Sequence, residues 1–75
     1  MANEDLVRMA NQIAHFFAPY PQDEAVEGVR DHLTKFWTPV MRRDLVTLVE
    51  NAANDHGSVH PLVVQAVHPW STRTA

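Results

Sequence analysis

Apolar residues recur at intervals of three and four positions along most of this chain, in segments that are separated by prolines. This spacing places the apolar side chains of a segment on one face of an α-helix and its polar side chains on the other. The sequence contains no strand-like alternation, internal repeat or low-complexity tract. The pattern predicts an all-α fold, a small bundle of three main helices plus a short C-terminal helix.

The first predicted helix covers residues 3–18. Its apolar residues fill about half of a helical wheel, and its polar residues fill the other half. Glu4 can pair with Arg8 one turn later. Pro19 ends the helix because proline cannot donate a backbone hydrogen bond and disfavours a helical conformation in the residue before it.

The second predicted helix covers residues 23–37 and has a narrower apolar stripe. Asp31 can pair with Lys35 across one turn. Gly28 lies inside this helix, where it costs about 1 kcal/mol relative to alanine. We interpret it as a position where another part of the chain packs closely against the helix backbone.

The third and fourth predicted helices both begin at a proline. Thr38 can cap the third helix, which covers residues 39–54 and has a broad apolar arc. Residues 54–57, with the sequence NDHG, are typical of a helix end. The final helix is short and covers residues 61–68.

A chain of 75 residues without cysteine has room for one small domain and cannot use disulfides or thiolate-bound metals to stabilise it. We expect residues 1–70 to form a single helical domain and residues 71–75 to form a mobile C-terminal tail. The net charge of -3 disfavours nucleic acid as a partner. The acidic start is unlike a secretory signal and no apolar stretch could span a membrane, so we expect a cytoplasmic protein.

Motifs for catalysis and for metal binding are absent from the sequence. His56 and His60 are four residues apart, but Gly57 and Pro61 prevent them from sharing a regular helical face. The carboxylates lie at predicted helix starts, where they complement the helix dipole. We therefore assign no catalytic, cofactor-binding or metal-binding residue and expect a protein that is not an enzyme.

Aromatic residues are numerous for so short a chain. Neighbours on a helix point about 100° apart, so at least one member of the pairs at 16–17 and 36–37 should reach the surface. We assign Phe16, Leu33 and Phe36 to the core. An exposed aromatic side chain is a candidate anchor for a partner protein.

Arg42 and Arg43 lie in the first turn of the third predicted helix, where a positive charge opposes the helix dipole. Solvated charge and partner binding are both open interpretations of this pair. In the second interpretation, Trp37, Met41 and the two arginines form one mixed patch that meets carboxylates of a larger partner. The candidate partner-binding residues are Asn11, Phe17, Trp37, Met41, Arg42 and Arg43.

Several segments of the chain resemble the delta subunit of NAD-dependent formate dehydrogenase. They are residues 6–13 (LVRMANQI), Phe16-Phe17, His32-Leu33 and residues 36–42 (FWTPVMR), with a weaker similarity at residues 61–63. The MANQI segment and the FWxPxMR pattern are the more specific parts of this resemblance, which extends over residues 6–67.

The resemblance implies an accessory subunit of a cytoplasmic formate dehydrogenase complex. Our physical interpretation is that this non-catalytic subunit stabilises the catalytic subunits or assists their assembly through an aromatic and arginine interface. The larger subunits of such complexes, above all the catalytic alpha subunit, would be its partners. They hold a molybdenum or tungsten pterin, iron–sulfur clusters and FMN, and pass electrons from formate to NAD. The present chain is expected to bind none of these cofactors.

Two other classes of protein remain open from the residues alone. A free-standing homo-oligomeric or regulatory helical module would bury the same aromatic residues against its own copy, so a homodimer is allowed for the isolated chain. A protein that binds or delivers a small molecule would need a cavity.

Overall fold

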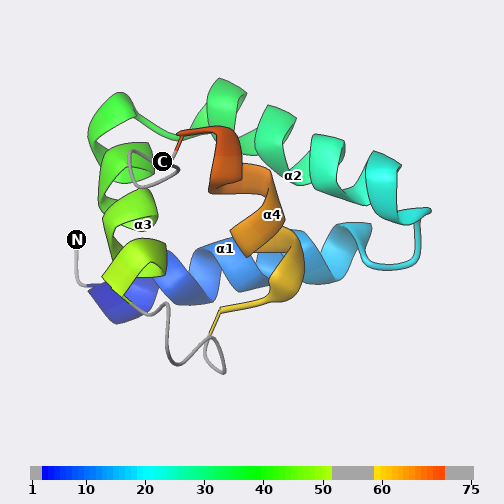
Figure 1. The fold of residues 1–75 in the computed structure, drawn as a ribbon, viewed down its shortest axis with the longest axis horizontal. Coiled ribbons are helices and arrows are strands. Elements are labelled where there is room, and N and C mark those ends of the chain that lie inside the picture. The colour runs from blue at the N-terminus through cyan, green and yellow to red at the C-terminus, as the bar shows by residue number, and fades with distance from the viewer. Residues whose placement is uncertain (1–2, 52–58, 71–75) are drawn as a thin grey trace.

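Four α-helices and one 3-10 helix follow one another in the computed structural model, which describes residues 3–51 and 59–70. They are α1 (Asn3–Phe17), α2 (Gln22–Phe36), α3 (Pro39–Asn51), α4 (Pro61–Val67) and the 3-10 helix η2 (His68–Trp70) (Figure 1). The described residues contain no strand, and the predicted series of three longer helices and a short one is confirmed.

The helix boundaries agree with the sequence prediction to within one residue wherever the structure describes them. At the start of α3, the Thr38 hydroxyl oxygen accepts a hydrogen bond from the backbone N–H of Met41 at 3.2 Å, which confirms the predicted cap. The predicted end of the third helix beyond Asn51, the stop signal at residues 54–57 and the tail at residues 71–75 lie outside the described residues.

Helices α1 and α2 run antiparallel, and the turn between them brings the end of α1 beside the start of α2 (Figure 1). Helix α4 packs against both of them, in front of the pair in the view of Figure 1. Helix α3 connects the far end of α2 back toward α1 and packs against α1. The short α4 therefore lies across the antiparallel pair, mainly against α2.

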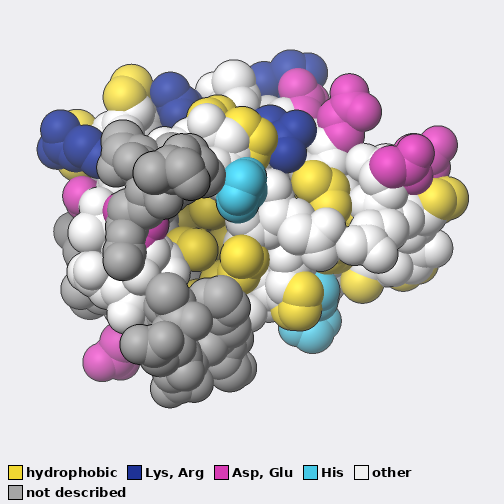
Figure 2. Space-filling view, viewed as in Figure 1, with side chains coloured by type: hydrophobic (Ala, Val, Ile, Leu, Met, Phe, Trp, Pro, Cys, Tyr) yellow, Lys and Arg dark blue, Asp and Glu magenta, His cyan; other side chains and the backbone are white. Residues whose placement is uncertain are grey.

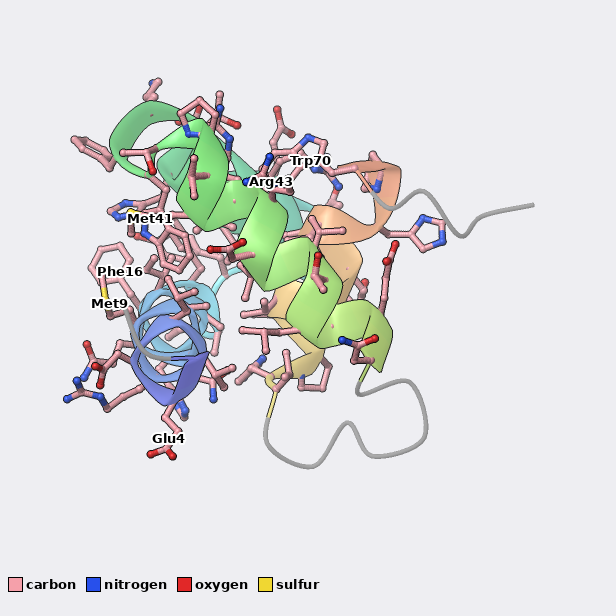
Figure 3. The ribbon with its side chains drawn as sticks, turned by 90° about the vertical axis from the view of Figure 1, so that its left-hand side faces the viewer. Glu4, Met9, Phe16, Met41, Arg43 and Trp70 are labelled. Carbon is pink, nitrogen blue, oxygen red and sulfur yellow. The ribbon has the colours of Figure 1, made fainter. Side chains whose placement is uncertain are left out.

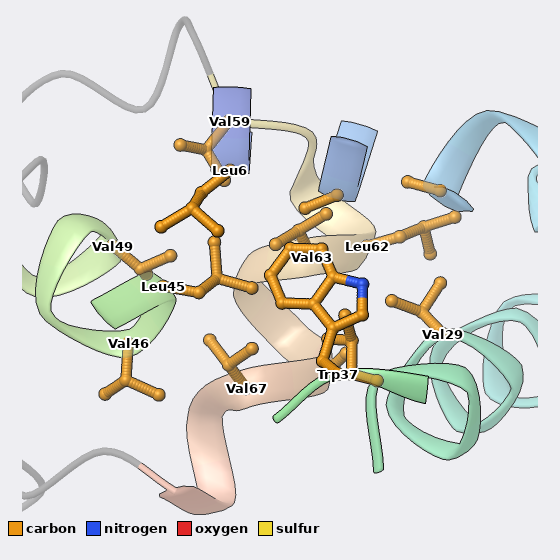
Figure 4. Close-up of a cluster of buried hydrophobic side chains, with 14 of the residues drawn as sticks. Leu6, Val29, Trp37, Leu45, Val46, Val49, Val59, Leu62, Val63 and Val67 are labelled. Carbon is orange, nitrogen blue, oxygen red and sulfur yellow. The ribbon is translucent and has the colours of Figure 1, made fainter. Parts of the chain in front are cut away.

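The buried side chains form one apolar cluster that draws on all four α-helices (Figure 4). Alanines of three helices allow the backbones to approach closely in this cluster. Among the described residues, no polar or charged side chain is buried. The members of the cluster are Leu6, Ala10, Ala14, Ala25, Val29, Leu33, Trp37, Leu45, Val46, Val49, Val59, Leu62, Val63, Ala66 and Val67.

The aromatic residues are not distributed as the helical wheel suggested. Leu33 is fully buried as predicted, but Phe16 and Phe36 are 68% and 72% exposed, so their assignment to the core is wrong. Phe16 lies about 160° around the helix from Ala14, on the side away from the core stripe. Trp37 takes the core position instead, because the chain leaves the helix there in an extended conformation and turns the indole inward (Figure 4).

Two ion pairs form along the first two helices, and one of them differs from the prediction. Lys35 contacts Asp31 at 3.1 Å, as the sequence predicted. Arg8 contacts Asp5 at 2.9 Å rather than Glu4, so the predicted pairing of Arg8 is wrong. Both spacings, three and four residues, bring side chains together on a helix surface, and the spacing alone did not decide between them.

Candidate partner-binding surfaces

Phe16 and Phe36 are the most exposed of the large apolar side chains in the described part of the chain. Gly28, His32 and Phe36 follow one another at intervals of four on α2 and so form one strip along that helix. Gly28 meets the ring of Phe17 on α1, which places this strip along the seam between the two helices.

Ring contacts link the exposed phenylalanines to this seam. The imidazole of His32 lies 4.7 Å from the ring of Phe36, and the ring of Phe16 lies edge-on to Phe17 at 5.0 Å. Met9, Phe16 and Met41 project from α1 and α3 on the side away from α4 (Figure 3). We use the name phenylalanine face for the strip made by Met9, Phe16, His32, Phe36 and Met41.

Paired charges of α1 and α2 border this face, and Asp5 lies one turn before Met9 on the same side of α1. The ion pairs Asp5–Arg8 and Asp31–Lys35 each neutralise themselves within one helix. On the side of the molecule where α4 lies, charged side chains gather along α2 (Figure 2). The face therefore combines two exposed phenylalanines with half-buried methionine and histidine side chains, and exposed aromatic side chains of this kind are typical of surfaces that bind other proteins.

Three of the candidate residues have roles inside the fold. Trp37 is only 6% exposed, so its predicted place on a surface patch is wrong. The side-chain oxygen of Asn11 accepts a hydrogen bond from the backbone N–H of His60 at 2.9 Å, which ties α1 to the start of α4. Phe17 is half-buried and packs against the core. The remaining candidates, Met41, Arg42 and Arg43, lie on α3.

Arg42 binds the C-terminal end of α2. Its Nη1 donates hydrogen bonds to the carbonyl oxygens of Leu33 at 3.3 Å, Thr34 at 3.2 Å and Trp37 at 2.6 Å. Carbonyls at the end of a helix lack a full set of partners within it, and a cation at this end is favoured by the helix dipole. Local stability therefore explains Arg42, contrary to the expectation from the sequence, because its position at the start of α3 is also the end of α2.

Arg43 lies on the other side of α3 from Met41. Figure 3 shows Met41 with Phe16 and Met9 of the phenylalanine face and Arg43 near Trp70, with α3 between the two groups. The single mixed patch expected from the sequence is therefore divided. A groove of about 400 Å³ opens on the Arg43 side, and its lining residues are Pro39, Arg42, Arg43, Val46, Thr47, Glu50 and Trp70.

The role of Arg30 was not predicted from the sequence. Its Nε donates to the carbonyl oxygen of Ala66 at 2.8 Å and its Nη2 to that of Gln65 at 3.4 Å. It binds the end of α4 in the way that Arg42 binds the end of α2. The partners are 36 and 35 residues away, so no local spacing could have indicated them.

Metal-binding and membrane-spanning features are absent from residues 3–51 and 59–70. No three histidine or acidic side chains in these ranges lie close enough together to share a metal ion. His15 and His60 are neighbours, with ring centroids 5.3 Å apart, but Nδ1 of His60 accepts a hydrogen bond from the backbone of Leu62. No helix in these ranges has the length and apolar run that a membrane span requires.

The chain matches one family of known proteins. The family model for the NADH-dependent formate dehydrogenase delta subunit, FdsD, matches residues 5–67. No curated protein and no solved structure matches the chain significantly. The match covers all four α-helices apart from the first two residues of α1, and it agrees with the resemblance seen in the sequence. The chain belongs to the family of formate dehydrogenase delta subunits.

Proposed function

We propose that this chain is a non-catalytic accessory subunit that binds the larger subunits of a cytoplasmic formate dehydrogenase through its phenylalanine face. The observation that carries the proposal is the exposure of Phe16 and Phe36, at 68% and 72%, on one strip of a small protein. Such side chains are costly to leave in water, and a partner surface that covers them removes that cost.

The free energy gained when a partner covers the exposed phenylalanines is large enough for an assembly role. Burying a phenylalanine that was exposed contributes about 1.5–3 kcal/mol. A protein that binds only the folded form of its partner stabilises that form by mass action, so covering an apolar area on the catalytic alpha subunit would favour its assembled state. The helices behind the face form one packed core, which gives the binding surface a fixed shape.

The cofactors of the complex fit the larger subunits rather than this chain. Iron–sulfur clusters are held by cysteine thiolates, and the sequence has no cysteine. The described histidines and carboxylates do not come together as a ligand set for molybdenum or tungsten. In this proposal the pterin, the iron–sulfur clusters, FMN and the NAD site belong to the partner subunits, and the present chain takes no part in their chemistry.

The test is to produce the larger formate dehydrogenase subunits with and without this chain. If the chain assists assembly, its omission lowers the yield and thermal stability of the complex, while formate oxidation per fully loaded complex stays nearly unchanged. An equal yield and stability without the chain would contradict the proposal.

A homodimer is the competing interpretation of the phenylalanine face. Sedimentation of the isolated chain across a range of concentrations separates the two. A dimer that persists at low concentration, together with no binding to the larger subunits, would favour the free-standing module.

A further inference from the structure

We propose that the groove beside Arg43 binds an acidic segment of a larger formate dehydrogenase subunit, with a carboxylate of that segment seated on the Arg43 guanidinium. This inference rests on the proposed function and adds a second contact on the other side of α3. The phenylalanine face would supply most of the apolar contact, and the groove would fix the orientation of the subunit through a charged contact.

The Arg43 guanidinium has no partner within the described part of the chain. The side chain is exposed, and neither of the ion pairs seen there includes it. The backbone carbonyl of Arg43 accepts from the Thr47 hydroxyl at 3.1 Å, which leaves the guanidinium uncommitted. The five N–H donors of an arginine fit a carboxylate in a two-point contact.

The surroundings of Arg43 increase the positive potential of the groove. Arg42 lines the same groove and uses only Nη1 in its bonds to the end of α2, so further donors of that guanidinium are uncommitted among the described residues. The lining residues include two positively charged arginines and one carboxylate, that of Glu50, so the net charge of the lining is positive. The first turn of α3 contains no acidic residue, whereas α1 and α2 each have two. The combined charge favours an anionic occupant over a neutral or basic one.

The groove has apolar walls as well as charge. Pro39, Val46 and Trp70 line it together with the arginines, and its volume of about 400 Å³ can hold one or two side chains. A partner segment that has a carboxylate next to an apolar side chain would contact both the arginines and the apolar walls of the groove. A nucleic acid is a poorer match because the whole chain carries a net charge of -3.

The test is a binding titration of the full-length chain against purified formate dehydrogenase that lacks this subunit. We expect Arg43→Glu to raise Kd by about tenfold or more at low salt, and Arg43→Lys to raise it much less. The effect of Arg43→Glu should shrink as NaCl rises from about 50 mM to about 500 mM, because salt screens the contact. Arg8→Glu is the control, since it makes the same charge change at an exposed position of α1, and its unfolding free energy is measured alongside because the change also breaks the surface pair with Asp5.

The outcomes separate this inference from the proposed function. If the wild-type chain does not bind the complex, both are wrong. If it binds and Arg43→Glu behaves like wild type or like Arg8→Glu, the groove contact is wrong and the phenylalanine face stands. If Arg43→Glu instead destabilises the isolated chain, and the same change causes no such loss in a chain without the residues after Trp70, the occupant is that segment of the chain itself and the inference is overturned.

Discussion

The ring of Phe17 lies directly against the backbone of Gly28, so that a Cβ atom added at Gly28 would be 2.5 Å from Cε1 of the ring. This contact confirms the interpretation of Gly28 as a site of close approach. It brings α1 and α2 together at the end of the seam on which the phenylalanine face lies. The ring is itself flanked by Phe16 at 5.0 Å and by Tyr20 at 5.9 Å between ring centroids, which restricts its movement.

Replacing Gly28 by alanine should lower the free energy of unfolding. Alanine gains about 1 kcal/mol in helix propensity, but the clash with the Phe17 ring costs about 2–3 kcal/mol, so we expect a net loss of about 1–2 kcal/mol. Urea unfolding followed by circular dichroism measures this. In a Phe17→Leu background the loss should be smaller, and an equal loss in both backgrounds would show that the ring is not the obstacle.

Replacing Arg42 by alanine should destabilise the protein more than the same change at Arg43. The Arg42 guanidinium supplies the donors for three carbonyls at the end of α2, and hydrogen bonds from a charged group contribute about 1.5–3 kcal/mol in total when partly shielded from water. Arg43→Ala should stay within about 0.5 kcal/mol of wild type. Equal unfolding free energies for the two variants, measured in urea, would contradict the capping role.

Asn11→Ala should loosen the attachment of α4 to α1. The lost hydrogen bond to the His60 backbone is half-buried, so we expect a cost of about 1 kcal/mol. Asn11→Asp keeps an oxygen acceptor at the same place and should cost less. Hydrogen exchange of the α4 amides provides the measurement: faster exchange is expected in Asn11→Ala, and unchanged protection there would show that the bond does not hold the helix.

The helices could be predicted from the sequence because their signals are local. The three- and four-residue spacing of apolar positions determined the number of helices, and Thr38 and the prolines marked their ends. The signal at Gly28 is also local. A glycine inside a helix lowers the stability of that helix, and a close contact with a neighbouring element offsets the cost, so the sequence indicated the close approach.

Which side chains are exposed and which contact the core could not be predicted from such local signals. The inward turn of Trp37 depends on where α2 ends, because Trp37 is the first residue after the helix and has an extended conformation. The partners of Arg30 and Asn11 are 36 and 49 residues away, so only the packing of α4 against α1 and α2 brings them together. These contacts give Asn11, Trp37 and Arg42 roles within the fold that the sequence did not indicate.

The central claim is that Phe16 and Phe36 anchor the larger subunits, and a binding isotherm with the Phe16→Ala/Phe36→Ala double variant tests it most directly. Both side chains are exposed, so the variant should fold normally, and Glu27→Ala, at an exposed position on the opposite side of α2 from Phe36, is the control. We predict at least about a hundredfold loss of affinity for the complex that lacks this subunit, because two phenylalanines would no longer be buried. Wild-type affinity in the double variant would contradict the account.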